Sequence, residues 1–418
     1  MSLTASRARL RFHPLTVAGV RPVAADGSAV AVTFEVPEEL REEFAFRAGQ
    51  HVTVRAVAGG REVRRAYSIC STPAELSDEG TLMIGVRRVP GGAFSTHACG
   101  GLRAGDRLEL LPPVGAFSAV FDPAQGRSYG AVAGGSGITP VLSLLRTGLA
   151  TEPRSVFTVV YANRGADSMM FGEELADLKN RYLDRFRLVH VFSREEPHQG
   201  LAGGRLDAAR LGRLLAGFPA CAEWFACGPP GLVTAARTAL TARGVDAVHT
   251  ELFRPEPTAD TRTGLARTRS DHTADLRSGD ARSSRTADLP SGDTRSGRTA
   301  DPRSGDARTG SGRIADPRDV PLKDTGRPRL EVVMDGRTSA VAVGDGETLL
   351  QAALPVRPEL PYSCENGVCG TCRALLVAGG ARMTGAWALS EDERAAGYVL
   401  TCRATPVTDH VRVDFDAL

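Results

Sequence analysis

Four cysteines late in the chain are the residues whose type and spacing most specifically indicate chemistry. Cys364, Cys369 and Cys372 follow a C-x4-C-x2-C pattern, and Cys402 comes after 29 intervening residues. Four thiolates with this spacing hold the two irons of a [2Fe–2S] cluster. Small residues between the cysteines suit a loop whose backbone N–H groups must turn towards the sulfurs. The pattern therefore predicts a centre that carries one electron at a time.

A structural zinc ion is the alternative reading of four cysteines. Zinc sites usually join two close C-x2-C pairs, whereas this chain groups three cysteines and leaves the fourth far away. The spacing resembles that of plant-type ferredoxins, whose clusters have potentials of roughly −400 mV. The resemblance implies a small α+β, β-grasp-like domain over residues 328–418. Acidic residues outnumber basic ones in this segment.

Three short motifs in the first 122 residues indicate a flavin site. Arg65-Ala66-Tyr67-Ser68 resembles the flavin-binding signature of the ferredoxin–NADP⁺ reductase superfamily. The arginine fork suits the flavin phosphate, the Tyr67 ring suits the isoalloxazine, and the Ser68 hydroxyl suits the region of flavin N5. Gly92-Ala93-Phe94-Ser95 matches the family's pyrophosphate motif, which favours FAD over FMN.

The third motif, Pro113-Val114-Gly115-Ala116-Phe117, matches a P-x-G-x-F strand end of the same superfamily. Taken alone, each motif fits an ordinary strand or turn, and an exposed arginine on a strand is the simple alternative for the first. Their order along a β-rich segment is what predicts flavin binding.

A glycine-rich turn predicts the nicotinamide nucleotide site. Residues 134–140 read GGSGITP between a short apolar strand and a helix, so backbone can approach a pyrophosphate at the helix N-terminus. The turn resembles the superfamily's G-x-G-x-x-P form. The candidate binding residues are Gly135, Gly137, Thr139 and Pro140.

A second turn, Cys227-Gly228-Pro229, ends a later apolar strand. In the superfamily such a turn brackets the nicotinamide, which makes Cys227 and Ser68 neighbours of the hydride path. Cys227 as a small buried hydrophobe is the alternative. Phe253 is a candidate for the aromatic residue that covers the flavin, and a simple core phenylalanine is the competing interpretation.

Two arginines favour NADPH over NADH, although NADH remains possible. Plant-type reductases place a Ser-Arg pair similar to Ser193-Arg194 at the 2′-phosphate, and Arg164 lies at the end of the preceding predicted strand. No acidic residue is apparent at the ribose-reading position. Two solvated surface arginines are the alternative.

The chain divides into four segments. Short alternating runs over 1–122 predict an antiparallel β-barrel, and strand–helix alternation over 123–255 predicts an α/β domain with a parallel sheet. Residues 256–327 contain no aromatic residue and repeat the motif TADxxSGD, which predicts a disordered linker. The ferredoxin-like domain occupies 328–418.

The composition limits the class of partner. A net charge of +2 over 418 residues and the lack of a long apolar run predict no nucleic-acid and no membrane partner. The N-terminus lacks a signal-peptide pattern, so we expect a cytoplasmic protein whose eight cysteines form no disulfide framework.

Longer strings, among them AYSICS, VPGGAFS and PYSCENGVCGTCRA, resemble the family of ring-1,2-phenylacetyl-CoA epoxidase reductase subunits. The resemblance implies that electrons pass from NAD(P)H through FAD and the [2Fe–2S] cluster to a diiron oxygenase. It does not cover the repeat segment. A reductase for another oxygenase, Rieske or diiron, stays open. So does a non-catalytic binding protein with a zinc module.

The acidic cluster domain is expected to bind transiently to basic surface elsewhere on the chain. Because its linker is predicted to be long and disordered, we expect this domain to be mobile and to meet the flavin and the oxygenase in turn.

Overall fold

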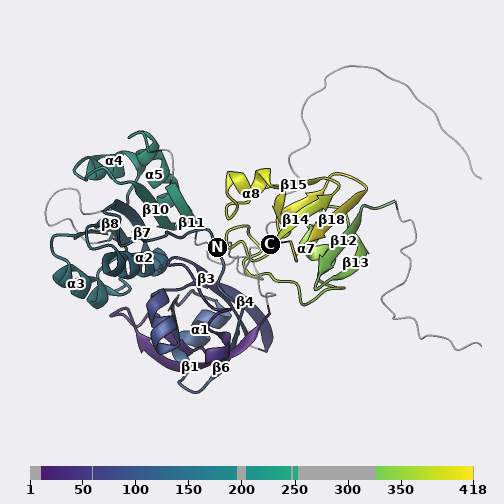
Figure 1. The fold of residues 1–418 in the computed structure, drawn as a ribbon, viewed down its shortest axis with the longest axis horizontal. Coiled ribbons are helices and arrows are strands. Elements are labelled where there is room, and N and C mark those ends of the chain that lie inside the picture. The colour runs from purple at the N-terminus through teal and green to yellow at the C-terminus, as the bar shows by residue number, and fades with distance from the viewer. Residues whose placement is uncertain (1–10, 59, 195–203, 246–247, 253–325, 418) are drawn as a thin grey trace, which may run out of the picture. The chain divides into compact units, whose positions relative to one another are not determined.

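The computed structural model describes residues 11–58, 60–194, 204–245, 248–252 and 326–417. Three large β-sheets organise these residues, one in each predicted domain (Figure 1). The repeat segment and Phe253 lie outside the described residues, so the predictions made for them stay predictions.

The first body is an antiparallel six-stranded sheet in the order β4-β3-β6-β1-β2-β5. Its strands bury a continuous core of Val, Leu, Ile and Phe side chains. The predicted antiparallel barrel class is confirmed. The elements are β1 (His13–Pro22), β2 (Ala29–Glu35), η1 (Glu38–Leu40), β3 (His51–Ala58), β4 (Arg61–Ser68), η2 (Glu75–Glu79), β5 (Thr81–Arg87), α1 (Ala93–Gly100) and β6 (Arg107–Leu110).

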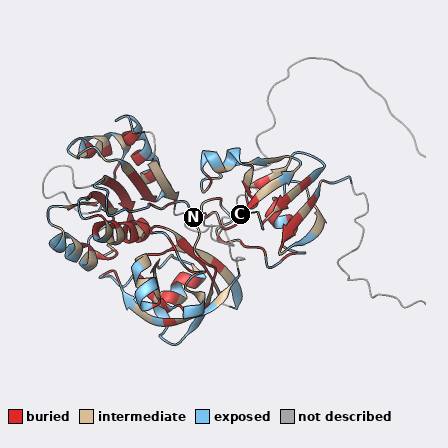
Figure 2. Ribbon diagram, in the orientation of Figure 1, coloured by how far each residue is buried: buried red, intermediate tan, exposed pale blue. Residues whose placement is uncertain are grey.

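The second body is a parallel five-stranded sheet in the order β11-β10-β7-β8-β9. Its strands are apolar runs because both faces are covered, and Figure 2 shows much of the sheet buried. The predicted α/β fold is confirmed. The elements are β7 (Ser128–Gly134), η3 (Gly135–Gly137), α2 (Ile138–Thr151), β8 (Val156–Asn163), α3 (Gly172–Arg181), β9 (Phe186–Phe192), α4 (Ala208–Ala216), β10 (Glu223–Gly228), α5 (Pro230–Thr241) and β11 (Val248–Leu252).

The barrel and the parallel sheet share one apolar core. Cys70 and Phe117 of the barrel belong to the same buried cluster as Leu142 of α2. The Ser143 hydroxyl on α2 also donates a 2.7 Å hydrogen bond to the Ser71 carbonyl. A common core makes it costly to separate the two bodies, so the groups that line their junction are held in a defined arrangement.

The third body is a mixed five-stranded sheet in the order β13-β12-β18-β14-β16, with β12 and β18 parallel. Capping boxes start both of its helices, at Thr348 and at Ser390. This is the predicted α+β ferredoxin-like fold. The elements are β12 (Arg329–Met334), β13 (Arg337–Ala342), α7 (Leu349–Ala353), β14 (Arg373–Ala378), β15 (Ala381–Met383), α8 (Glu391–Ala395), β16 (Tyr398–Leu400), β17 (Ala404–Pro406) and β18 (His410–Asp414).

Two further observations concern disulfides and membrane-spanning helices. None of the eight cysteines, all of which lie in the described ranges, forms a disulfide. Over the described ranges, no helix has the length and apolar character that crossing a membrane requires.

Candidate functional site

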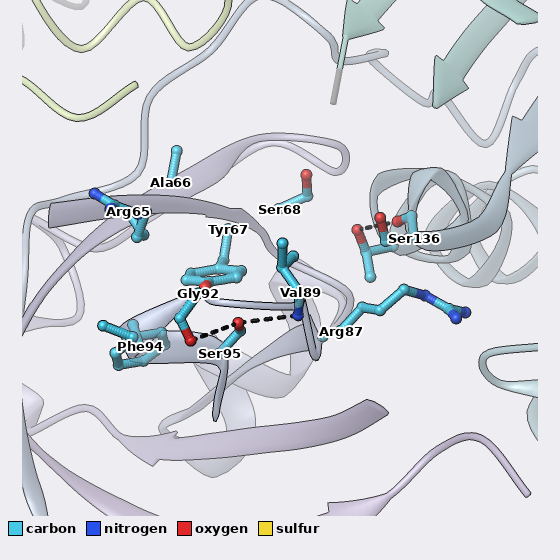
Figure 3. Close-up of a pocket in the computed structure, with 13 residues that line it drawn as sticks. Arg65, Ala66, Tyr67, Ser68, Arg87, Val89, Gly92, Phe94, Ser95 and Ser136 are labelled. Atoms are coloured by element: carbon cyan, nitrogen blue, oxygen red, sulfur yellow. Dashed lines mark hydrogen bonds between the residues drawn. The ribbon is translucent and has the colours of Figure 1, made fainter. Parts of the chain in front are cut away.

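Two of the predicted flavin motifs line one pocket, together with two residues of the glycine-rich turn (Figure 3). Strand β4 contributes Arg65–Ser68, and the start of α1 contributes Gly92–Ser95. The Tyr67 ring lies 5.4 Å from the Phe94 ring, centroid to centroid. Ser136 and Thr139 complete the lining from the nucleotide domain. The pocket thus combines an aromatic surface with hydroxyl groups and two arginines, Arg65 and Arg87.

The turn before α1 is shaped to approach a phosphate. The Ser95 hydroxyl donates to the Gly92 carbonyl at 3.3 Å and accepts from the Val89 N–H at 3.1 Å (Figure 3). A Cβ on Gly92 would stand 2.6 Å from that hydroxyl, so the turn requires glycine here. The first N–H groups of α1 then have no partner within their own helix and can face an anion.

The P-x-G-x-F segment fixes the start of β3. Gly115 has a φ of +124°, and a Cβ there would stand 2.9 Å from His51 Nδ1. A Cβ on Gly49 would overlap the Phe117 carbonyl at 2.3 Å. The motif therefore positions the buried His51 ring at the junction between the barrel and the parallel sheet.

A carboxyl group that the sequence reasoning missed lies at this junction. Glu251 on β11 accepts a 3.2 Å hydrogen bond from the Ser68 hydroxyl, and Cys227 Sγ stands 3.6 Å from the same oxygen. His51 Nδ1 is 3.7 Å from the other carboxyl oxygen. Ser68 and Cys227, both predicted beside the hydride path, thus contact the same carboxyl group.

Burial sets the charge of this group. Removal from water raises the pKa of Glu251 to about 7. Burial also lowers the pKa of His51 to about 4, so its ring is neutral at pH 7. An acidic residue at the carboxyl end of a parallel strand was the available signal, because sites form at that edge of a sheet.

The two glycine turns of the nucleotide domain pack against each other. A Cβ on Gly137 would stand 2.2 Å from the Cys227 carbonyl oxygen. Gly228 has a φ of +145°, and a Cβ there would stand 3.0 Å from Gly134. Thr139 donates to the Ser136 carbonyl at 2.9 Å, and Pro140 lies in the first turn of α2. This contact holds the N-terminus of α2 beside the Cys227-Gly228 turn.

We expect Gly137→Ala to weaken nucleotide binding and to destabilise the fold by about 1–3 kcal/mol. Its φ of −63° suits alanine, so the loss would come from overlap with the Cys227 carbonyl alone. Titration with NADPH and thermal unfolding measure both effects. Gly212→Ala on α4 is the matched control, since open space surrounds that position. Unchanged NADPH affinity in Gly137→Ala would contradict the role of this contact.

The arginines predicted for the 2′-phosphate are neighbours. The Arg194 N–H donates to the Arg164 carbonyl at 2.9 Å, and the Ser193 N–H donates to the Asn163 carbonyl at 2.9 Å. Arg164, Ser193 and Arg194 are exposed at the carboxyl ends of β8 and β9. Two cationic side chains and a hydroxyl therefore stand at one edge of the sheet.

Arg87 is a second residue that the sequence reasoning missed. It lines the pocket from β5, and its Nε is buried without a hydrogen-bond partner among the described residues. Burial lowers the pKa of this guanidinium, although arginine keeps its charge at neutral pH. A buried cation among the residues that line the pocket favours an anionic ligand there.

The four predicted cluster cysteines lie together in the third body. Three of them are buried, and Cys364 is half-buried. Hydrogen bonds with Cys369 and Cys402 lower the pKa of Cys364 well below the ordinary thiol value, and Cys402 in turn contacts Cys372. Gly367 and Gly370 have φ of +76° and +73°, so the loop has the left-handed turns that an L side chain resists.

The arrangement of these thiols fits a two-iron cluster. They contact one another in pairs around the loop, and a [2Fe–2S] cluster is held by four such thiolates spread around two irons. In the described part of the chain, no three or more His, Cys, Asp or Glu side chains are grouped as ligands of one metal ion. The assignment of Cys364, Cys369, Cys372 and Cys402 as cluster ligands stays a prediction.

Each of the three bodies matches a known protein family. Residues 23–119 match an oxidoreductase FAD-binding domain, residues 131–238 an oxidoreductase NAD-binding domain, and residues 332–407 a 2Fe-2S iron-sulfur cluster binding domain. The chain is an NAD(P)H-dependent flavin and iron–sulfur oxidoreductase.

Individual relatives narrow the class. A component of the 1,2-phenylacetyl-CoA epoxidase of Escherichia coli (strain K12) is 38% identical, over 97% of this chain and 98% of the relative. The ferredoxin reductase component of the 3-ketosteroid-9-alpha-monooxygenase of Rhodococcus rhodochrous is 31% identical, over 96% of each chain. Phthalate dioxygenase reductase shares the fold, with a TM-score of 0.52, 19% identity and coverage of 97% and 98%. The chain belongs to the family of oxygenase reductase components that includes this phenylacetyl-CoA epoxidase component.

Proposed function

We propose that this protein passes electrons from NADPH, through FAD and a [2Fe–2S] cluster, to the oxygenase component of a phenylacetyl-CoA epoxidase. The observation that carries the proposal is the junction where Ser68 and Cys227 meet Glu251, between a flavin-type pocket and a nucleotide-type turn. The 38% identity over nearly the whole of both chains supports the choice of partner. We expect the protein to act in the cytoplasm.

The pocket residues would bind and orient FAD. Arg65 would neutralise the phosphate nearer the flavin, and Gly92 and Ser95 would hold the pyrophosphate with backbone N–H and hydroxyl groups. Tyr67 would pack on the ring system. The bound flavin supplies two-electron acceptance from a hydride and one-electron release.

The junction residues would align the nicotinamide and handle the proton. Cys227 and Gly228 would flank the nicotinamide. The glycine-rich turn would bind the nucleotide pyrophosphate through Gly135, Gly137, Thr139 and Pro140. Ser68 Oγ already donates to Glu251 Oε2. Ser68 would therefore act as a proton relay: its hydroxyl would give its proton to the Glu251 carboxylate while its oxygen takes up a proton from the bound flavin. Phe253 remains a candidate for covering the flavin.

The cluster would be held by Cys364, Cys369, Cys372 and Cys402. The bound cluster supplies one-electron transfer. It would let the two electrons of a hydride reach a one-electron acceptor one at a time. Oxygenase reduction requires this splitting, and the family membership supports it.

Arg164, Ser193 and Arg194 would select NADPH by binding its 2′-phosphate. We expect Arg164→Ala and Arg194→Ala each to raise the KM for NADPH about tenfold or more and to leave the KM for NADH unchanged, because hydrogen bonds to a charged group are lost. Steady-state kinetics with both nucleotides measure this. Arg187→Ala, an exposed arginine on β9, is the matched control. Equal losses with NADPH and NADH would contradict the assignment.

Purified oxygenase components provide the test of the partner. The account predicts NADPH-dependent reduction of the phenylacetyl-CoA epoxidase oxygenase at a higher kcat/KM than that of a Rieske oxygenase or another diiron hydroxylase. A higher kcat/KM for the Rieske protein would contradict the proposed partner. It would favour the alternative function, a reductase for another oxygenase, as in the ketosteroid monooxygenase relative.

A further inference from the structure

Arg64, beside the flavin motif on β4, is a buried cation that the proposed function does not use. Its side chain is only 6% exposed, although Arg61 and Glu62 on the same strand are exposed. Glu62 accepts from its Nε at 2.9 Å. A guanidinium is buried only where its remaining donors find partners.

Those partners come from the [2Fe–2S] domain. The described residues of the barrel, the nucleotide domain and the [2Fe–2S] domain form one compact unit. Within it, the two terminal nitrogens of Arg64 donate to the carbonyls of Leu360 and Pro358 at 3.1 and 3.2 Å. The Arg64 guanidinium also lies 4.5 Å from the centre of the Tyr362 ring. We call Arg64, Pro358, Leu360 and Tyr362 the docking contact.

A second contact joins the same strands to the cluster loop. The hydroxyls of Thr53 on β3 and Thr371 are 3.2 Å apart and buried. Thr371 is adjacent to the cluster ligand Cys372. Thr53 pairs across the sheet with Ala66, which lines the flavin pocket. Directly paired residues of an antiparallel sheet share a face, so the Thr53–Thr371 contact places the cluster loop on the face of β3 and β4 that carries Ala66.

The docking contact is not an ion pair between the two domains, because Arg64 meets two backbone carbonyls and an aromatic ring of the [2Fe–2S] domain. The Arg64 fork needs two oriented acceptors, and a lysine has no planar fork to satisfy both. Buried anchors of this kind, arginine on an aromatic ring, account for most of the binding energy of many interfaces.

We propose that Arg64 is the positioning residue that docks the [2Fe–2S] domain of the same chain on the flavin barrel for electron transfer. In the docked arrangement, the reduced flavin loses one electron and one ferric iron of the cluster gains it. NAD(P)H supplies the electrons, and nothing else is consumed. This inference rests on the proposed function, because it presumes that both cofactors bind.

The test uses the full-length holoprotein and three variants. Arg64→Ala removes the docking contact, Arg64→Lys keeps the charge without the fork, and Arg61→Ala is the control from the same strand. Anaerobic stopped-flow with NADPH follows flavin reduction and cluster reduction separately. Hydrogen–deuterium exchange of residues 357–363 reports docking without depending on turnover.

We expect cluster reduction to slow about tenfold or more in Arg64→Ala, with flavin reduction within about twofold of wild type and faster exchange over 357–363. Arg64→Lys should show a smaller change in the same direction, and Arg61→Ala no change. Unchanged cluster reduction and exchange in both Arg64 variants would overturn the proposal. So would wild-type cluster reduction whose rate rises with protein concentration, since the domain would then come from a second copy. Absence of flavin reduction in the wild type would instead contradict the proposed function.

Discussion

Replacing Cys369 by serine should abolish one-electron delivery and leave hydride acceptance intact. We expect reduction of cytochrome c or of the oxygenase to fall to roughly one per cent of wild type or less, because an incomplete ligand set does not retain the cluster. NADPH-dependent reduction of a two-electron dye should persist, since Ser68, Glu251 and Cys227 lie in the other two bodies. Steady-state assays with both acceptors measure the split.

A matched substitution controls for loss of a thiol. Cys221→Ser changes a half-buried free cysteine outside both cofactor sites and should leave both activities unchanged. Iron content and the visible spectrum show directly whether the cluster is retained. Equal loss of dye and cytochrome c reduction in Cys369→Ser would mean that the cluster is not downstream of the flavin.

Replacing Glu251 by glutamine should slow flavin reoxidation about a hundredfold, within the usual range for a lost proton acceptor. Burial raises the pKa of Glu251 to about 7. The Ser68 hydroxyl can pass a proton only to the ionised carboxylate. In the wild type, electron delivery should therefore rise as the pH increases to about 7 and level off above it. The glutamine variant should show a low rate with no such step.

Stability measurements separate this chemistry from a structural effect. The native pKa of Glu251 lies above its ordinary value of 4.5, so the native state binds the proton more tightly than the unfolded chain does. Its contribution to the free energy of unfolding is complete below about pH 4.5 and is lost as the pH rises through about 7. Glu251→Gln should thus be at least as stable as the wild type at pH 8. A pH step that survives in the variant would assign the titration to another group.

The fold class followed from local patterns that tertiary structure did not override. Alternating runs such as Val30–Val36 became barrel strands, and the apolar run ending at Gly134 became a central parallel strand. The cysteine spacing likewise indicated the domain that the family comparison confirmed. These patterns depend on period and spacing, which a single sequence displays directly.

Glu251, Arg87 and Arg64 were missed for a physical reason. Each is a charged residue on a strand, where a solvated side chain is the ordinary interpretation. Their roles depend on partners far along the chain, such as Ser68 for Glu251 and Leu360 for Arg64. Only the packed structure reveals which charges are buried. The residue roles predicted from motifs, including those of Arg65 and Ser95, remain predictions that substitutions must test.

The central claim is a sequence of electron carriers, nicotinamide to flavin to cluster. Anaerobic stopped-flow of the holoprotein with one equivalent of NADPH tests it most directly, with flavin absorbance and the electron paramagnetic resonance of the frozen samples as readouts. The account predicts that flavin bleaching comes first, and that the signal of a reduced [2Fe–2S] cluster then grows as the flavin reoxidises. A cluster that stays oxidised while the flavin is fully reduced would contradict it.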